Sequence, residues 1–80
     1  MTWSVSWSWQ APSRISAIES VSGHLCVAYG LELTLFDEKN EVQWQRSMPF
    51  KAHAICNGDG RIGVLAAHAF YLLNTVDGSM

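Results

Sequence analysis

The chain has 80 residues, of which 49% are hydrophobic and 15% are charged, and its formal net charge is -2. This length allows one domain or part of one, and the high apolar content argues against intrinsic disorder. Five Lys and Arg against seven Asp and Glu exclude the basic surface of a nucleic-acid-binding protein. The longest uncharged apolar stretch, Ile62–Val76, is shorter than the ~20 residues of a membrane helix. The first residues lack the basic start and apolar core of a signal peptide, so we expect a cytoplasmic protein with no membrane partner.

All the predicted elements are β-strands. At the N-terminus Trp3, Val5, Trp7 and Trp9 alternate with polar residues, which is the pattern of a strand with one apolar face. After them, apolar runs separated by turn residues at short intervals predict antiparallel strands. These runs are Ile15–Ser20, Leu25–Tyr29, Leu33–Phe36, Val42–Gln45, Ala52–Cys56, Ile62–Ala66 and Phe70–Leu73.

The sequence repeats itself with an offset of 37 residues. When residues 4–43 are aligned with residues 41–80, eight of the forty pairs are identical, and they fall on apolar and turn positions. The identical pairs are Val5/Val42, Trp7/Trp44, Pro12/Pro49, Ala17/Ala54, Ile18/Ile55, Gly23/Gly60, Val27/Val64 and Leu35/Leu72. A helix over Val64–Leu73 is the one helical alternative, favoured by its alanines, but its alignment with Val27–Phe36 favours two strands.

A unit of four short strands in 37 residues is close to the ~40–45-residue blade of a β-propeller. The run from Gly23 to Asp37 contains a glycine turn, an apolar strand, a tight turn and a second strand that ends in Leu-Phe-Asp, and Trp44 follows it. This run resembles the blades of quinoprotein-type and Trp-Asp-repeat propellers, and the run from Asp59 to Gly78 repeats it. The resemblance implies an all-β fold of two four-stranded antiparallel blades, and it implies no particular activity.

The phase of the repeat predicts how the two blades are completed. Residues 1–10 would form an outer, closing strand, residues 11–47 the first blade, and residues 48–80 a second blade without an outer strand of its own. Because rings contain about four to eight blades, we expect three or four copies to form rings of six or eight blades, each N-terminal strand completing a neighbour's second blade. The alternative is that the chain is the start of a longer propeller. The expected assembly residues are Trp3, Val5, Trp7, Trp9, Phe70 and Leu72.

Few residues of the chain suggest catalytic or metal chemistry. Cys26 and Cys56 are expected to be reduced and buried, because free cysteine packs as a small hydrophobic residue. A disulfide, and a zinc site that adds His24 and His53, are the alternatives. Three aspartates lie in turn segments, where a carboxylate commonly accepts hydrogen bonds from nearby backbone N–H groups; they are Asp37, Asp59 and Asp77. The sequence therefore predicts no catalytic residue, no cofactor and no metal.

The expected function is that of a non-enzymatic scaffold that assembles with itself and binds other proteins. Arg14 and Lys51 are repeat partners that precede the innermost strands, so copies of them would surround one mouth of the channel and attract an acidic partner. Trp7 and Trp44 are repeat partners and are expected in the core between blades. Trp3 and Trp9 have no aromatic repeat partner, so the alternative function is a lectin-like propeller that binds a glycan or small ligand on these rings.

Overall fold

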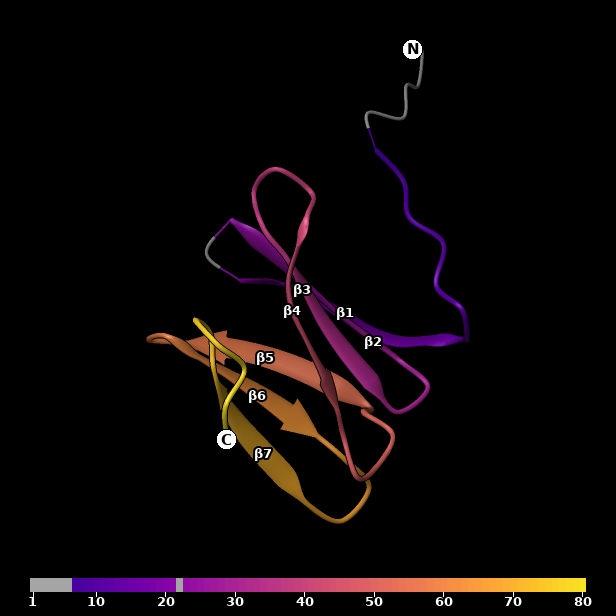
Figure 1. The fold of residues 1–80 in the computed structure, drawn as a ribbon. Helices are drawn as coiled ribbons and strands as arrows, with labels where there is room; N and C mark the ends of the chain where they lie inside the picture. Colours follow the sequence, from indigo (N-terminus) through magenta and orange to yellow (C-terminus); the bar gives the residue numbers. More distant parts are fainter. Residues whose placement is uncertain (1–6, 22) are drawn as a thin grey trace, which may run out of the picture.

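The computed structural model describes residues 7–21 and 23–80, and in this part of the chain the regular elements are all β-strands. Seven strands form two antiparallel sheets (Figure 1). The first sheet has the order β1 (Ile15–Val21), β2 (His24–Tyr29), β3 (Glu32–Phe36), β4 (Val42–Ser47). The second sheet has the order β5 (Ala54–Gly58), β6 (Arg61–Leu65), β7 (Phe70–Asn74). The all-β prediction is confirmed, and each strand predicted from Ile15 onward overlaps an observed one.

The predicted N-terminal strand is not formed in the part that the structure describes. Trp7 to Trp9 lie outside both sheets, so a single chain does not form this strand here and its pairing with another copy stays a prediction, while Trp3 and Val5 lie outside the described residues. A β-strand is stabilised by hydrogen bonds to a neighbouring strand, and the neighbour expected for this segment belongs to another copy. Figure 1 shows the segment from Trp7 onward beside the first sheet, on the side away from the second sheet.

The two sheets repeat the same strand pairing with an offset of 37 residues. In the first sheet Glu19 lies opposite Cys26, and Cys26 lies opposite Leu35. In the second sheet the residues 37 positions later, Cys56, Gly63 and Leu72, face one another in the same way. Because side chains alternate between the two faces of a strand, repeat partners occupy corresponding faces of the two sheets. The sequence repeat is thus also a repeat of register.

The turns at one end of the sheets are fixed by their aspartates. Asp37 Oδ1 accepts hydrogen bonds from the backbone N–H groups of Lys39 at 2.9 Å and Glu41 at 3.0 Å. Asp77 Oδ1 accepts one from the N–H of Ser79 at 2.9 Å, and this hydrogen bond lowers the pKa of the Asp77 carboxyl. The turn role predicted for these two aspartates is confirmed. Asp59 occupies the turn between β5 and β6 with a φ of 23°.

The core lies between the two sheets. We call the face of the first sheet that carries Cys26 and Leu35 its front face, and the opposite face its back face. In the second sheet the front face is the one that carries their repeat partners, Gly63 and Leu72. The front face of the first sheet packs on the back face of the second. The buried residues of this interface are Val21, Cys26, Ala28, Leu33, Leu35, Met48, Ala52, Ile62, Val64 and Leu73. Two outer faces are left, the back of the first sheet and the front of the second.

Candidate functional site

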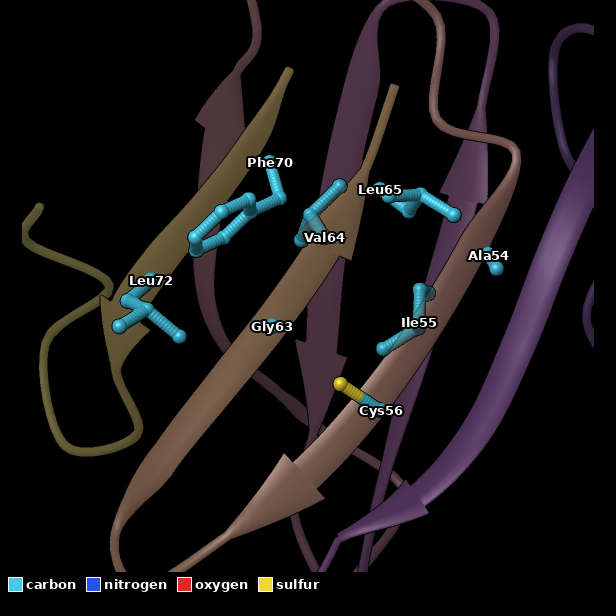
Figure 2. Close-up of a pocket in the computed structure, with 8 residues that line it drawn as sticks. All are labelled: Ala54, Ile55, Cys56, Gly63, Val64, Leu65, Phe70 and Leu72. Atoms are coloured by element: carbon cyan, nitrogen blue, oxygen red, sulfur yellow. The ribbon is translucent and has the colours of Figure 1, made fainter. Parts of the chain in front are cut away.

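The front face of the second sheet is apolar and open to solvent. Leu65 is 52% exposed, Phe70 69% and Leu72 48%, whereas their repeat partners on the front of the first sheet are exposed by no more than 1%. These side chains border a hollow of about 390 Å³, which Figure 2 shows. The residues that line it are Ala54, Ile55, Cys56, Gly63, Val64, Leu65, Phe70 and Leu72. An exposed apolar face of this kind marks an interaction surface.

Cys56 and Gly63 form the floor of this hollow. They lie opposite each other on β5 and β6, and a Cβ atom added to Gly63 would be 2.6 Å from Cys56 Sγ. Glycine at this position therefore leaves the space that the thiol fills. Cys56 is exposed, so the prediction that it is buried is wrong; in the single chain no sheet covers the face on which it lies.

The edge of the second sheet provides a further place for association. β7 pairs with β6 on one side, and within residues 7–21 and 23–80 no strand pairs with its other side. An open strand edge presents backbone donors and acceptors to which another strand can add. Two predicted assembly residues, Phe70 and Leu72, lie on this edge strand and are exposed.

The N-terminal tryptophans that the structure describes pack on the back of the first sheet. The Trp7 ring lies edge-on to Phe36 with 5.3 Å between ring centroids. The Trp9 ring lies edge-on to Tyr29 at 5.2 Å and to Phe36 at 5.1 Å. These contacts hold the Trp9 ring against the first sheet, and the alternative of a glycan platform stays a prediction. Trp7 and Trp9 also line a second hollow of about 330 Å³, together with Ile15, Ile18 and Leu25.

Trp7 and Trp44 occupy equivalent positions. Trp44 of β4 packs against the core between the sheets, as predicted, and its Nε1 donates a hydrogen bond of 2.8 Å to the backbone oxygen of Thr75, just after β7. Trp7 lies against Phe36, the last residue of β3. Each tryptophan thus lies at the end of the third strand of the sheet that follows it in the chain. The two tryptophans differ in burial, because Trp7 is 37% exposed and lies outside the core between the sheets to which Trp44 belongs.

Arg14 and Lys51 lie together in a hollow of about 270 Å³ between the starts of β1 and β5. Its lining consists of three repeat pairs: Arg14/Lys51, Ile15/Ala52 and Ser16/His53. The sequence predicts that Arg14 and Lys51 share one surface, and the structure adds His53 to it. No acidic side chain lines this hollow, so it is a cationic site among the described residues.

The charged residues are distributed unequally between the two ends of the strands. The end with Arg14 carries the loops before β1, between β2 and β3, between β4 and β5, and between β6 and β7, and these loops contain no Asp or Glu. The carboxylate nearest to them in the sequence, Glu32 at the start of β3, accepts hydrogen bonds from Ser47. The carboxylates in the turns and loop of the opposite end are Asp37, Glu38, Glu41, Asp59 and Asp77. One end of the sheets is therefore cationic and the other acidic.

The residues that suggested zinc are dispersed. Cys26 is fully buried in the core and burial raises the pKa of its thiol to about 12, while Cys56 lies on the open front face and His53 in the hollow of Arg14. Both cysteines are free thiols. Among the residues that the structure describes, no group of three or more His, Cys, Asp and Glu side chains could hold a metal ion.

Comparison with known proteins found no matching family model and no matching curated protein. The described residues also contain no helix long and apolar enough to cross a membrane.

Proposed function

We propose that this chain is a two-blade unit of a β-propeller which assembles with further copies of itself into a closed ring and serves as a non-enzymatic scaffold for binding other proteins. The observation that carries the proposal is the contrast between repeat partners. Leu35 is fully buried on the front of the first sheet, whereas Leu72 is 48% exposed at the same position of the second. The second sheet thus presents the surface that, one repeat earlier, is covered by another sheet.

The open edge of β7 supports the same assembly. A neighbouring copy supplies a strand for this edge, the segment around Trp7, which the single chain leaves outside its sheets. The proposed assembly contains three or four copies, which gives six or eight blades and falls within the range of about four to eight blades that close a ring.

The energies indicate that association needs both the face and the strand. Burying a large apolar side chain contributes about 1.5–3 kcal/mol. Leu65, Phe70 and Leu72 are 52%, 69% and 48% exposed, so burying their exposed parts would together contribute about 2.5–5 kcal/mol. Loss of translational and rotational freedom costs about 4–15 kcal/mol. The apolar face alone therefore falls short, and the hydrogen bonds and tryptophan contacts of an added strand are needed to hold the copies together.

The end of the strands that carries Arg14 is the proposed binding surface for another protein. Its loops expose two large apolar side chains, Leu31 at 54% and Phe50 at 58%, next to the cationic hollow of Arg14, Lys51 and His53. Aromatic and cationic side chains together are typical of protein interfaces. An acidic segment with apolar anchors is the partner that suits this surface.

Light scattering of the purified protein tests the assembly. We expect a mass of three or four chains, and we expect that deletion of Met1–Gln10 reduces it to that of one chain. Replacement of Met1–Gln10 by a Gly/Ser sequence of the same length is the control for chain length and should also give single chains. A monodisperse 8.9 kDa species of the intact chain would refute the proposal.

A further inference from the structure

The apolar faces of the chain point to the way in which two copies join. This inference rests on the proposed function and adds the docking surface to it. We propose that the front of the second sheet of one copy docks on the back of the first sheet of a second copy, in the register that the chain already uses between its own sheets, so that Cys56 of one copy lies beside Ser20 of the other.

The argument begins with the interface inside the chain. There the front of the first sheet packs on the back of the second, and both sheets have the same strand register with an offset of 37 residues. The front of the second sheet and the back of the first, on which Trp7 and Trp9 already pack, are the repeat counterparts of these two packed faces. The new contact therefore continues the existing interface by one more sheet, and the same step repeated from copy to copy leads around a ring.

The contact between β1 and β5 inside the chain identifies the residues that should meet between copies. Within the chain Asn57 Nδ2 donates hydrogen bonds to the backbone oxygen of Ser20 at 2.8 Å and to Glu19 Oε1 at 3.5 Å. One repeat later, Cys56 takes the place of Glu19, and Ser20 of the second copy takes the place of Asn57. The contact between Glu19 and Asn57 thus becomes a contact between Cys56 and Ser20 of different copies.

Cys56 and Ser20 of the same chain do not meet. Cys56 lies on the front of the second sheet, which faces away from the first sheet. Ser20 lies opposite Leu25, whose side chain packs on the back of the first sheet, and Ser20 is exposed. The two side chains therefore point out of opposite sides of the two-sheet structure. Because the backbones of β1 and β5 are in contact, only a product with the mass of two or more chains counts as a link between copies.

Apolar character and charge agree with this pairing. The front of the second sheet carries a hollow of about 390 Å³ and the back of the first sheet one of about 330 Å³, both bordered by apolar side chains. Arg61, exposed at the start of β6, lies at the end of the strands where the second copy presents Asp37, Glu38 and Glu41. The N-terminal segment need not leave the first sheet, because Trp7 already lies there as Trp44 lies beside β7.

The variant Ser20→Cys tests the register in the intact chain. The native Cys56 supplies the second thiol, and oxidised glutathione accepts the two electrons and two protons released when the disulfide forms. We expect disulfide-linked copies on a non-reducing gel, up to the mass of the assembly. A short bis-maleimide reagent, which spans a greater distance, is used in parallel so that the result does not depend on ideal disulfide geometry.

Two controls are matched to this variant. Ser47→Cys places a thiol on the same sheet but at the opposite corner, at the end of β4, and should not link to Cys56. The double variant Ser20→Cys/Cys56→Ala should also remain unlinked, because Cys26 is buried. If Ser20→Cys has the same mass in solution as the wild-type assembly but links no better than Ser47→Cys, the register is wrong and the proposed function stands. If the wild-type chain is monomeric, both fail.

Discussion

Leu35 and Leu72 offer the sharpest comparison of the two halves of the chain, because they are repeat partners in different surroundings. Leu35 is fully buried between the sheets and Leu72 is 48% exposed. Removal of a buried leucine side chain by substitution with Ala costs about 2–5 kcal/mol. A domain of this size has a free energy of unfolding of about 4–12 kcal/mol, so Leu35→Ala should remove a large part of the stability of the single chain.

Leu72→Ala should behave differently. In the single chain about half of the side chain already contacts water, so the loss should be below about 1 kcal/mol. In the assembly Leu72 would be surrounded as Leu35 is, and the same substitution would then weaken each contact between copies by about 2–3 kcal/mol, or about 30- to 150-fold in dissociation constant.

The two effects are measured separately. Urea unfolding followed by tryptophan fluorescence, at a dilution where light scattering gives single chains, reports the stability of the monomer. Light scattering over a concentration series reports the dissociation constant. If Leu35→Ala does not fold, Ile62→Val, at another fully buried position, should still give a loss of about 0.5–1.5 kcal/mol. The reasoning is refuted if Leu72→Ala leaves the dissociation constant unchanged, or if it destabilises the dilute chain as much as Leu35→Ala.

Two further predictions concern the single chain. Gly78 has a φ of +72° and a Cβ added there would be 2.8 Å from two Trp44 ring atoms, whereas Gly60 has a φ of +75° and an added Cβ would meet no atom within 4 Å. Gly60→Ala should therefore cost about 1–2 kcal/mol of stability from the backbone alone, and Gly78→Ala should cost more. Equal falls in Tm for the two variants would count against the Trp44 contact. Burial raises the pKa of the Cys26 thiol from 9.0 to about 12, so the unfolded chain loses this proton first and stability should fall as the pH rises from about 9 towards 12. Urea unfolding at pH 8 and pH 10 should show a smaller fall for Cys26→Ala than for wild type, and equal falls would contradict the buried thiol.

The strands could be predicted from the sequence because their information is local. Alternating apolar residues fix which face of a strand is buried, and the turns depend on single residues such as Asp37, whose carboxylate accepts two backbone N–H bonds. The 37-residue offset made the second sheet predictable from the first. The N-terminal segment lacks this kind of information, because alternation in residues such as Trp7 and Trp9 specifies an apolar face without specifying the strand that pairs with it.

The exposed cysteine could not be predicted for a related reason. Cys56 is a small hydrophobic residue with apolar neighbours, which is typical of a buried position, and Gly63, opposite it on β6, leaves space for its thiol. Whether the residue is covered depends on the presence of another sheet, which is a property of the assembly and not of the local sequence. His53 was missed because a lone histidine carries little information until the fold places it beside Arg14 and Lys51.

Several apolar side chains that so short a chain does not bury lie on the two outer faces of its sheets. Leu65, Phe70 and Leu72 are exposed on the front of the second sheet, and Ile15 and Ile18 on the back of the first. These two faces are repeat counterparts of the two faces that bury the core. Five of the eleven large apolar side chains that are exposed in the described part of the chain lie on this pair of surfaces, and others, such as Leu31, Phe50 and Val76, lie in loops. The placement of these five is the result expected of a chain that completes its core by contact with another copy.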